Sequence, residues 1–162
     1  MDLAQPAAHN KLGLNRARDG IQKMSFQLSV LPEELAIVRL PVCVRFSDII
    51  QDMGSNQPFW SITKTNDEWS FVIPTSMSHQ WEHLTNYQIN SPWKAIKVLG
   101  PLDFELTGIL HQLSQPLAKK NISLFSISTF DTDYILVKSN TLKAACNALQ
   151  ESGYNVVTPL SQ

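Results

Sequence analysis

Residues 122–138 read ISLFSISTFDTDYILVK, two apolar runs separated by a short polar segment that contains two aspartates. Apolar residues alternate with others in the first run and dominate the second, as in neighbouring β-strands joined by a tight turn. We expect strands at 122–129 and 133–138. Four side chains should then face the same side of a sheet: Phe125, Ile127, Ile135 and Val137.

Helical patterns flank this hairpin on both sides. One apolar stripe runs through residues 105–120 and another through residues 141–152, with Gly153 as the C-cap of the second helix. Strand-like segments at 93–99 and 154–158 enclose the set. The order β-α-β-β-α-β predicts a ferredoxin-like unit with two helices on one face of its sheet.

The first half of the chain carries a weaker version of the same plan. Strand-like segments surround a short helical stretch at 46–53, and residues 75–91 are polar and read as a linker. We therefore predict an α+β fold of two ferredoxin-like units with antiparallel sheets. The expected division is a tail at 1–24, a degenerate first unit with its linker at 25–90, and a second unit at 91–162.

The charge and composition exclude several classes of protein. The net charge is -1 and the 13 Lys and Arg residues are scattered, whereas nucleic-acid binding usually needs a basic face. No apolar run is long enough to span a membrane and no signal peptide is evident, so we expect a soluble cytoplasmic protein with no membrane partner. Cys43 and Cys146 read as small buried hydrophobes rather than a disulfide or a metal pair.

The two acids of the hairpin, Asp131 and Asp133, admit several readings. A calcium loop of the EF-hand type fails, because Leu136 and Leu142 occupy the positions where Gly and Glu are needed. An acid pair for glycoside hydrolysis cannot be judged from one hairpin. Asp131 reads equally as a turn residue, because Asp bonds its own backbone. For Asp133, which begins a strand, we favour contact with a ligand.

A second candidate is the loop Gly100-Pro101-Leu102-Asp103-Phe104, which follows a strand and precedes the predicted helix. Free N–H groups at a helix N-terminus accept a carboxylate, although Asp103 can equally act as an ordinary cap. With Asp133 nearby, the two ends suit an α-amino acid, with N–H groups for its carboxylate and an aspartate for its ammonium. Gly108 permits close approach of a ligand or, equally, close packing of helix on sheet.

Other motifs give weaker signals. His79 and His83 lie four residues apart, but no third zinc ligand is evident. No nucleophile with its base can be identified, so we expect a non-enzyme that needs no cofactor.

The chain resembles a known family through three motifs: LGPLDFELTGIL at 99–110, PLAKKNISLFSISTFDTDYILVK at 116–138 and LKAACNAL at 142–149. They are similar to ACT domains of the family that includes the mammalian cytosolic arginine sensor and many small bacterial proteins. The segments PFWSITKT and EWSFVIP resemble a degenerate first ACT domain of that family. ACT domains bind small ligands, usually amino acids, often at interfaces between two ACT units, so the resemblance implies amino-acid binding.

The resemblance also implies that Ser123 and Leu124 contact a ligand held by a neighbouring ACT unit. The full predicted ligand set is Gly100, Pro101, Leu102, Asp103, Phe104, Gly108, Ser123, Leu124, Thr129, Phe130 and Asp133. The favoured reading is a regulatory protein that binds a small molecule, and it can act as a homodimer or on a regulated protein partner. Two alternatives stay open: an interaction module with a vestigial ligand site, and a small enzyme that uses Asp131 or Asp133.

Overall fold

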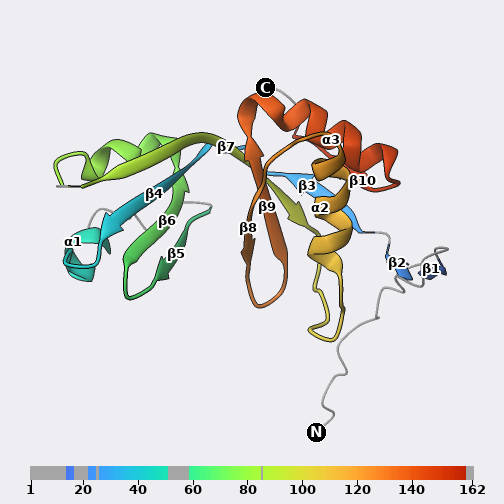
Figure 1. Cartoon of the computed structure of the whole chain (residues 1–162), viewed down its shortest axis with the longest axis horizontal. Helices are drawn as coiled ribbons and strands as arrows, with labels where there is room; N and C mark the ends of the chain where they lie inside the picture. The colour runs from blue at the N-terminus through green and yellow to red at the C-terminus, as the bar shows by residue number, and fades with distance from the viewer. Residues whose placement is uncertain (1–13, 17–21, 25, 51–58, 85, 160–162) are drawn as a thin grey trace, which may run out of the picture.

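The structure is a computed structural model, and it describes residues 14–16, 22–24, 26–50, 59–84 and 86–159 of the chain (Figure 1). The strands within these ranges are β1 (Leu14–Arg16), β2 (Gln22–Met24), β3 (Gln27–Val30), β4 (Leu35–Pro41), β5 (Ser61–Lys64), β6 (Glu68–Pro74), β7 (Gln88–Val98), β8 (Phe125–Ser128), β9 (Asp133–Lys138) and β10 (Asn155–Val157). The helices are α1 (Phe46–Ile50), α2 (Ile109–Lys119) and α3 (Leu142–Glu151), with 3-10 turns η1 (Thr75–Trp81) and η2 (Ser139–Thr141).

A long antiparallel ribbon forms the centre of the molecule. β3 and β4 follow one another along the same side of β7, so that Val30 is opposite Ile96 and Leu35 is opposite Trp93. The residues between them stay attached, because the Leu31 N–H donates to the Ala95 carbonyl at 2.8 Å. This ribbon carries both halves of the molecule.

The C-terminal lobe comprises β3, the second part of β7, β8, β9, β10, α2 and α3. Its strands lie in the order β10-β3-β7-β9-β8, and β10 runs parallel to β3. α2 and α3 cover one face of this sheet (Figure 1). The core beneath them is apolar throughout and includes Ile96, Val98, Leu113, Ile135, Val137 and Leu149.

The N-terminal lobe comprises β4, β5, β6, the first part of β7, α1 and η1. Its strands lie in the order β7-β4-β6-β5. Read along the chain, this lobe is β4-α1-β5-β6-η1-β7, the same β-α-β-β-α-β order as the C-terminal lobe, with 3-10 helix η1 in place of a second α-helix. The predicted α+β fold with two ferredoxin-like units is confirmed, and β7 is both the last strand of the first unit and the first strand of the second.

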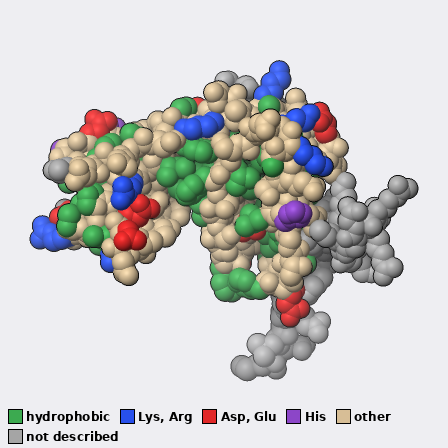
Figure 2. Space-filling model, in the orientation of Figure 1, with side chains coloured by type: hydrophobic (Ala, Val, Ile, Leu, Met, Phe, Trp, Pro, Cys, Tyr) green, Lys and Arg blue, Asp and Glu red, His purple; other side chains and the backbone are tan. Residues whose placement is uncertain are grey.

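The faces of the two lobes that carry no helix turn toward each other across a hollow. Figure 2 shows the hollow between the lobes, with hydrophobic side chains gathered at its top. The Phe59 ring lies 4.9 Å from the Tyr134 ring and joins the two walls. A third apolar cluster lies on these faces, with Leu35, Val72, Trp93, Ala95 and Leu136 buried in it.

Several details of the sequence prediction were wrong. Residues 75–91 are not a linker, because η1 buries Met77 and Trp81 and β7 begins at Gln88. Residues 25–31 do not begin the first unit. Instead, β3 is an extra strand between β10 and β7 of the C-terminal lobe. The position of the boundary between the units stays a prediction.

Two further predictions about side chains and the tail need correction. Phe125 and Ile127 are opposite Leu136 and Tyr134, so they face the hollow rather than the helices. Cys43 is exposed, whereas Cys146 is buried as predicted. Within the predicted tail, β1 and β2 pair as a short antiparallel hairpin. The other residues of the tail, 1–13 and 17–21, lie outside the described residues.

Candidate functional site

The turn between β8 and β9 is held by two threonines. The Thr129 N–H donates to the Thr132 carbonyl at 2.8 Å, and the Thr132 N–H donates back to the Thr129 Oγ1 at 3.3 Å. Thr132 is buried, and its hydroxyl donates to the carbonyl of Val98 at the end of β7. The turn is therefore fixed both internally and to the neighbouring strand, which gives Asp133 a defined position.

Asp133 lies on the helix-covered face of the sheet. It shares that face with Ile135 and Val137, both in the core beneath α2 and α3. Ser128, directly opposite in β8, donates its hydroxyl to the Asp133 Oδ1 at 2.5 Å. Ser128 was not among the predicted site residues, although its position across a four-residue turn from Asp133 is a readable signal in the sequence.

The loop from Gly100 to Gly108 packs against the same turn. The Leu102 N–H donates to the Asp131 carbonyl at 2.9 Å. A Cβ on Gly100 would lie 2.7 Å from that carbonyl oxygen, so the close approach needs glycine at this position. Asp131 itself is exposed and meets the loop through its backbone, which agrees with its reading as a turn residue.

The predicted start of the helix at residue 105 was wrong, because α2 begins at Ile109. Asp103 does not cap a helix. Its Oδ1 accepts the Glu105 N–H at 3.0 Å and its carbonyl accepts the Leu106 N–H at 3.0 Å, which makes a turn within the loop. These bonds and the Leu102 contact occupy the N–H groups of Leu102, Glu105 and Leu106, so these three are not available to a ligand.

The N-terminus of α2, unlike the loop before it, has no side-chain cap on the N–H groups of its first turn. Gly108 is its N-cap residue with a φ of 78°, and no side chain caps the first turn. A Cβ on Gly108 would meet nothing within 4 Å, so there is open space beside it. Ile109, the next residue, belongs to the same core as Ile135, which follows Asp133 by two residues on the same face. The helix N-terminus and the carboxylate thus both adjoin the core of the C-terminal lobe.

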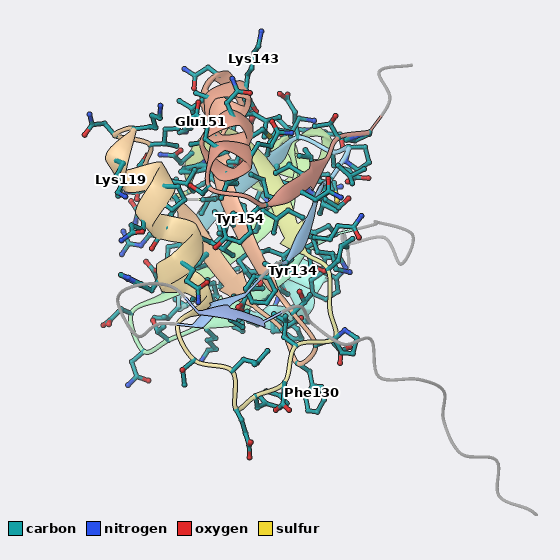
Figure 3. The ribbon with its side chains drawn as sticks, turned by 90° about the vertical axis from the view of Figure 1, so that its right-hand side faces the viewer. Lys119, Phe130, Tyr134, Lys143, Glu151 and Tyr154 are labelled. Carbon is teal, nitrogen blue, oxygen red and sulfur yellow. The ribbon has the colours of Figure 1, made fainter. Side chains whose placement is uncertain are left out.

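Two exposed aromatic rings project at this corner. Phe104 of the loop and Phe130 of the turn meet edge to face with centroids 4.9 Å apart, and they remain 74% and 79% exposed. Figure 3 shows Phe130 at the tip of the hairpin, pointing away from the body of the lobe. Pro101 beside them is also exposed, while Leu102 is half-buried against the core.

Ser123 and Leu124 lie apart from the turn, at the far end of the β8 segment. Ser123 is exposed and Leu124 is half-buried against the core of the C-terminal lobe. β8 pairs only with β9 among the described strands, so both residues adjoin a free edge of the sheet. The structure therefore brings the predicted residues into two groups, one at the turn and one at this edge.

Chemistry of other kinds finds little support in the described part of the chain. No group of three or more His, Cys, Asp or Glu side chains there can hold a metal ion, and no described helix is both long and apolar enough to cross a bilayer. His79 and His83 are both exposed in and just beyond η1.

Comparison with known proteins connects this architecture to the ACT domain. Residues 88–151 match a family model for the ACT domain. The mouse protein "Cytosolic arginine sensor for mTORC1 subunit 1" is 37% identical over 96 residues, which cover 57% of this chain and 29% of the mouse protein. The chain thus spans less than a third of the length of that relative.

Solved structures extend the likeness to most of the chain. A crystal structure of an Agobacterium tumefaciens protein aligns with a TM-score of 0.70 at 27% identity and covers 85% of this chain and 96% of that one. The regulatory subunit of aspartate kinase from Thermus flavus aligns with a TM-score of 0.60 at 9% identity, covering 80% and 99%. At 9% identity the second likeness concerns the fold alone.

Proposed function

Because this chain is an ACT-domain protein of the arginine-sensor-like family, we propose that it binds a free amino acid and that binding regulates a partner or the protein's own assembly. Two observations support the proposal: Asp133 begins β9 on the helix-covered face of the sheet, and no side chain caps the N-terminus of α2 in the same lobe. A carboxylate and a set of free backbone donors are the two groups that an α-amino acid needs.

Asp133 receives the ammonium group in this proposal. Ser128 holds the Oδ1 atom, which leaves the Oδ2 atom for the ligand. The ligand carboxylate binds the first-turn N–H groups of α2 and occupies the open space beside Gly108. This replaces the loop 100–104 as the main carboxylate contact, and gives that loop the role of a wall built from Pro101, Leu102 and Phe104.

The ligand side chain lies toward the aromatic pair Phe104 and Phe130. A small molecule covers part of these rings, and the remainder is covered by a neighbouring ACT unit whose Ser123 and Leu124 approach the same ligand. A regulated assembly follows from this arrangement, since a ligand shared between two units stabilises their contact. The mouse relative is named as a cytosolic arginine sensor, and we assign this chain a cytosolic, non-catalytic role of the same kind.

A thermal-shift screen against the twenty common amino acids tests the proposal. A ligand that binds only the folded state stabilises it by about 2.7 kcal/mol at one hundred times its Kd. Matched controls are the N-acetyl derivative and the methyl ester of whichever amino acid is found, because each removes one charged end. We expect both derivatives to lose the stabilisation.

A second candidate function rests on the exposure of Phe104 and Phe130. If no amino acid raises the Tm of the full chain, the site is vestigial and the aromatic pair marks an interaction module instead. Stabilisation by the free amino acid and equally by its N-acetyl derivative would separate ligand binding from the assigned role of Asp133.

A further inference from the structure

The hollow between the lobes has an apolar rim that the proposed ligand site does not use. Six half-buried side chains surround its buried floor: Leu31, Ile37, Phe59, Phe125, Ile127 and Tyr134. In Figure 2 the hydrophobic side chains at the top of the hollow are open to view. Tyr134 and Asp133 are neighbours in β9 and point to opposite faces, so this surface and the ligand site lie on the two sides of one sheet.

Two lysines bracket the apolar floor along β7 and β9. Lys97 is opposite Tyr134, and its Nζ lies 5.7 Å from the tyrosine ring. Lys138 is opposite Trp93, with its Nζ 4.5 Å from the indole ring and hydrogen-bonded to the Asn90 Oδ1. Neither amine has a carboxylate partner among the described residues, whose ion pairs involve other cations. The charges at the two ends of the floor are therefore positive and unneutralised.

The backbone positions of the two lysines can be compared along β9, because Lys97 is directly opposite Tyr134. Tyr134 and Lys138 are four residues apart on β9, which corresponds to about 13 Å at roughly 3.3 Å per residue. On an α-helix, residues seven positions apart lie on the same side, nearly two full turns and about 10.5 Å from each other. The flexible lysine and glutamate side chains span the small remaining difference. A helix is also narrow and convex, with a diameter of about 10–12 Å including side chains.

We propose that the hollow is a docking site for an amphipathic helical segment of a partner protein, with its apolar face on the rim and acidic residues about seven positions apart beside Lys97 and Lys138. Burial of the six apolar side chains supplies the affinity, and the two ion pairs fix the register and orientation. The proposal goes beyond amino-acid binding and does not depend on it.

A second copy of the chain fits this surface less well. A twofold interface sets the same patch of both copies against itself. Two concave hollows facing each other leave their floors apart, and they also bring the same lysines together. A convex acidic segment satisfies both the shape and the charge.

The test uses a fluorescein-labelled peptide of about 16 residues, long enough for about four helical turns, with Leu on one face and two Glu about seven positions apart on one side. A second peptide carries Lys at those two positions. Fluorescence anisotropy with the full chain should show the Glu peptide binding at least tenfold more tightly than the Lys peptide. The double variant Lys97→Glu/Lys138→Glu should reverse this order, and Ile127→Ser should weaken both peptides.

Lys143→Glu is the matched control, since Figure 3 shows Lys143 on α3 pointing away from the body of the protein. It should leave both affinities unchanged. Absence of binding by the Glu peptide, or equal binding of the two peptides, overturns the proposal. A wild-type dimer in light scattering that Ile127→Ser converts to a monomer also overturns it, because the occupant would then be a second copy.

Discussion

The β5–β6 hairpin of the N-terminal lobe and the β8–β9 hairpin of the C-terminal lobe are built on the same turn. In the first, the Thr65 N–H donates to the Glu68 carbonyl at 2.9 Å. In the second, the Thr129 N–H donates to the Thr132 carbonyl at 2.8 Å. In both, the threonine hydroxyl also accepts an N–H from the far side of the turn. The two backbones can therefore be compared residue by residue.

The pair of residues that closes each hairpin shows how far the lobes have diverged. In the C-terminal lobe this pair is Ser128 and Asp133, joined by a hydrogen bond. In the N-terminal lobe it is Lys64 and Trp69, with the Lys64 Nζ 5.4 Å from the indole ring. The same backbone position holds an acid, to which we assign ligand binding, in one lobe and a core tryptophan in the other. The same turn can therefore present a polar side chain or a packing one.

The different covers of the two sheets explain this divergence. The C-terminal lobe has two helices of 11 and 10 residues, and one of them presents a free N-terminus. The described cover of the N-terminal lobe consists of the five-residue α1 and the 3-10 helix η1. Stacked rings fill its core instead, with Trp69 between Phe46 and Phe71, and Phe71 against Trp81. In this lobe, packing between aromatic side chains takes the place of the packing that two long α-helices provide in the C-terminal lobe.

The largest expected effect comes from Trp69→Ala. Trp69 is buried, stacks on two rings and donates its Nε1–H to the Val44 carbonyl at 3.2 Å. Its removal should lower the free energy of unfolding by about 3–5 kcal/mol. Urea denaturation followed by circular dichroism measures this, with Asp133→Ala as the matched variant at the equivalent position. The comparison breaks if the two variants destabilise the protein equally.

Ligand affinity should show the opposite order. Asp133→Ala removes one partner of a charge pair, which typically costs about 2–5 kcal/mol, so affinity for the amino acid should fall at least tenfold. Calorimetric titration with the amino acid found in the screen measures this. Asp131→Ala is the control and should change affinity less, because Asp131 meets the loop through its carbonyl. Unchanged affinity in a folded Asp133→Ala variant would make the acid a turn residue like Asp131.

Two glycines sharpen the assignment of the loop in the C-terminal lobe. Gly100→Ala forces a Cβ against the backbone oxygen of Asp131 and should destabilise the protein by about 1–3 kcal/mol. Gly108→Ala meets open space, so only its positive φ is strained, at about 1–2 kcal/mol. Thermal unfolding of both variants gives the comparison. A larger loss for Gly108→Ala would show that the contact of Gly100 with the turn is dispensable.

The smallest expected effect concerns one tyrosine in each lobe. Burial raises the pKa of Tyr154, and burial followed by the nearby Glu82 carboxylate raises the pKa of Tyr87. In both tyrosines the folded-state pKa lies above the unfolded-state pKa of about 10. The contribution of each tyrosine to the free energy of unfolding is therefore fully present below pH 10, and it is lost as the pH rises through the folded-state pKa. Denaturation midpoints at about pH 9 and about pH 11 measure the loss.

Matched phenylalanine variants separate the two tyrosines. Tyr154→Phe should reduce the alkaline loss with little change at neutral pH. Tyr87→Phe should also cost about 0.5–1.5 kcal/mol at neutral pH, because the Tyr87 hydroxyl donates to the Ser78 carbonyl at 2.5 Å. An alkaline loss that neither variant reduces would assign the effect to other groups.

The sequence was sufficient for the β-α-β-β-α-β order of residues 93–158 and for the α+β fold. The helix predicted at 141–152 matches α3 at Leu142–Glu151, because its apolar stripe and the following glycine agree. The start of α2 was missed because Leu106 continues the apolar stripe. Gly108 marks the true boundary, since glycine adopts the positive φ at this N-cap without strain.

Other features depend on contacts that a local pattern does not contain. Phe125 and Ile127 sit in a hairpin with apolar residues on both faces, so alternation alone could not assign them to a face. The place of β3 depends on pairing with β10 near the other end of the chain. The space beside Gly108 and the bond between Ser128 and Asp133 likewise require three-dimensional positions.

The parallel pairing of β3 with β10 has a consequence for how the protein is made. Leu28 is opposite Val156, so the first strand of the sheet cannot pair with the last one until all the residues between them have been synthesised. A ribosome adds about 5–20 residues per second, and β3 therefore spends several seconds beside β7 with one edge unpaired. Emergence of β10 closes that edge, so this sheet is completed only after residues 155–157 have been synthesised.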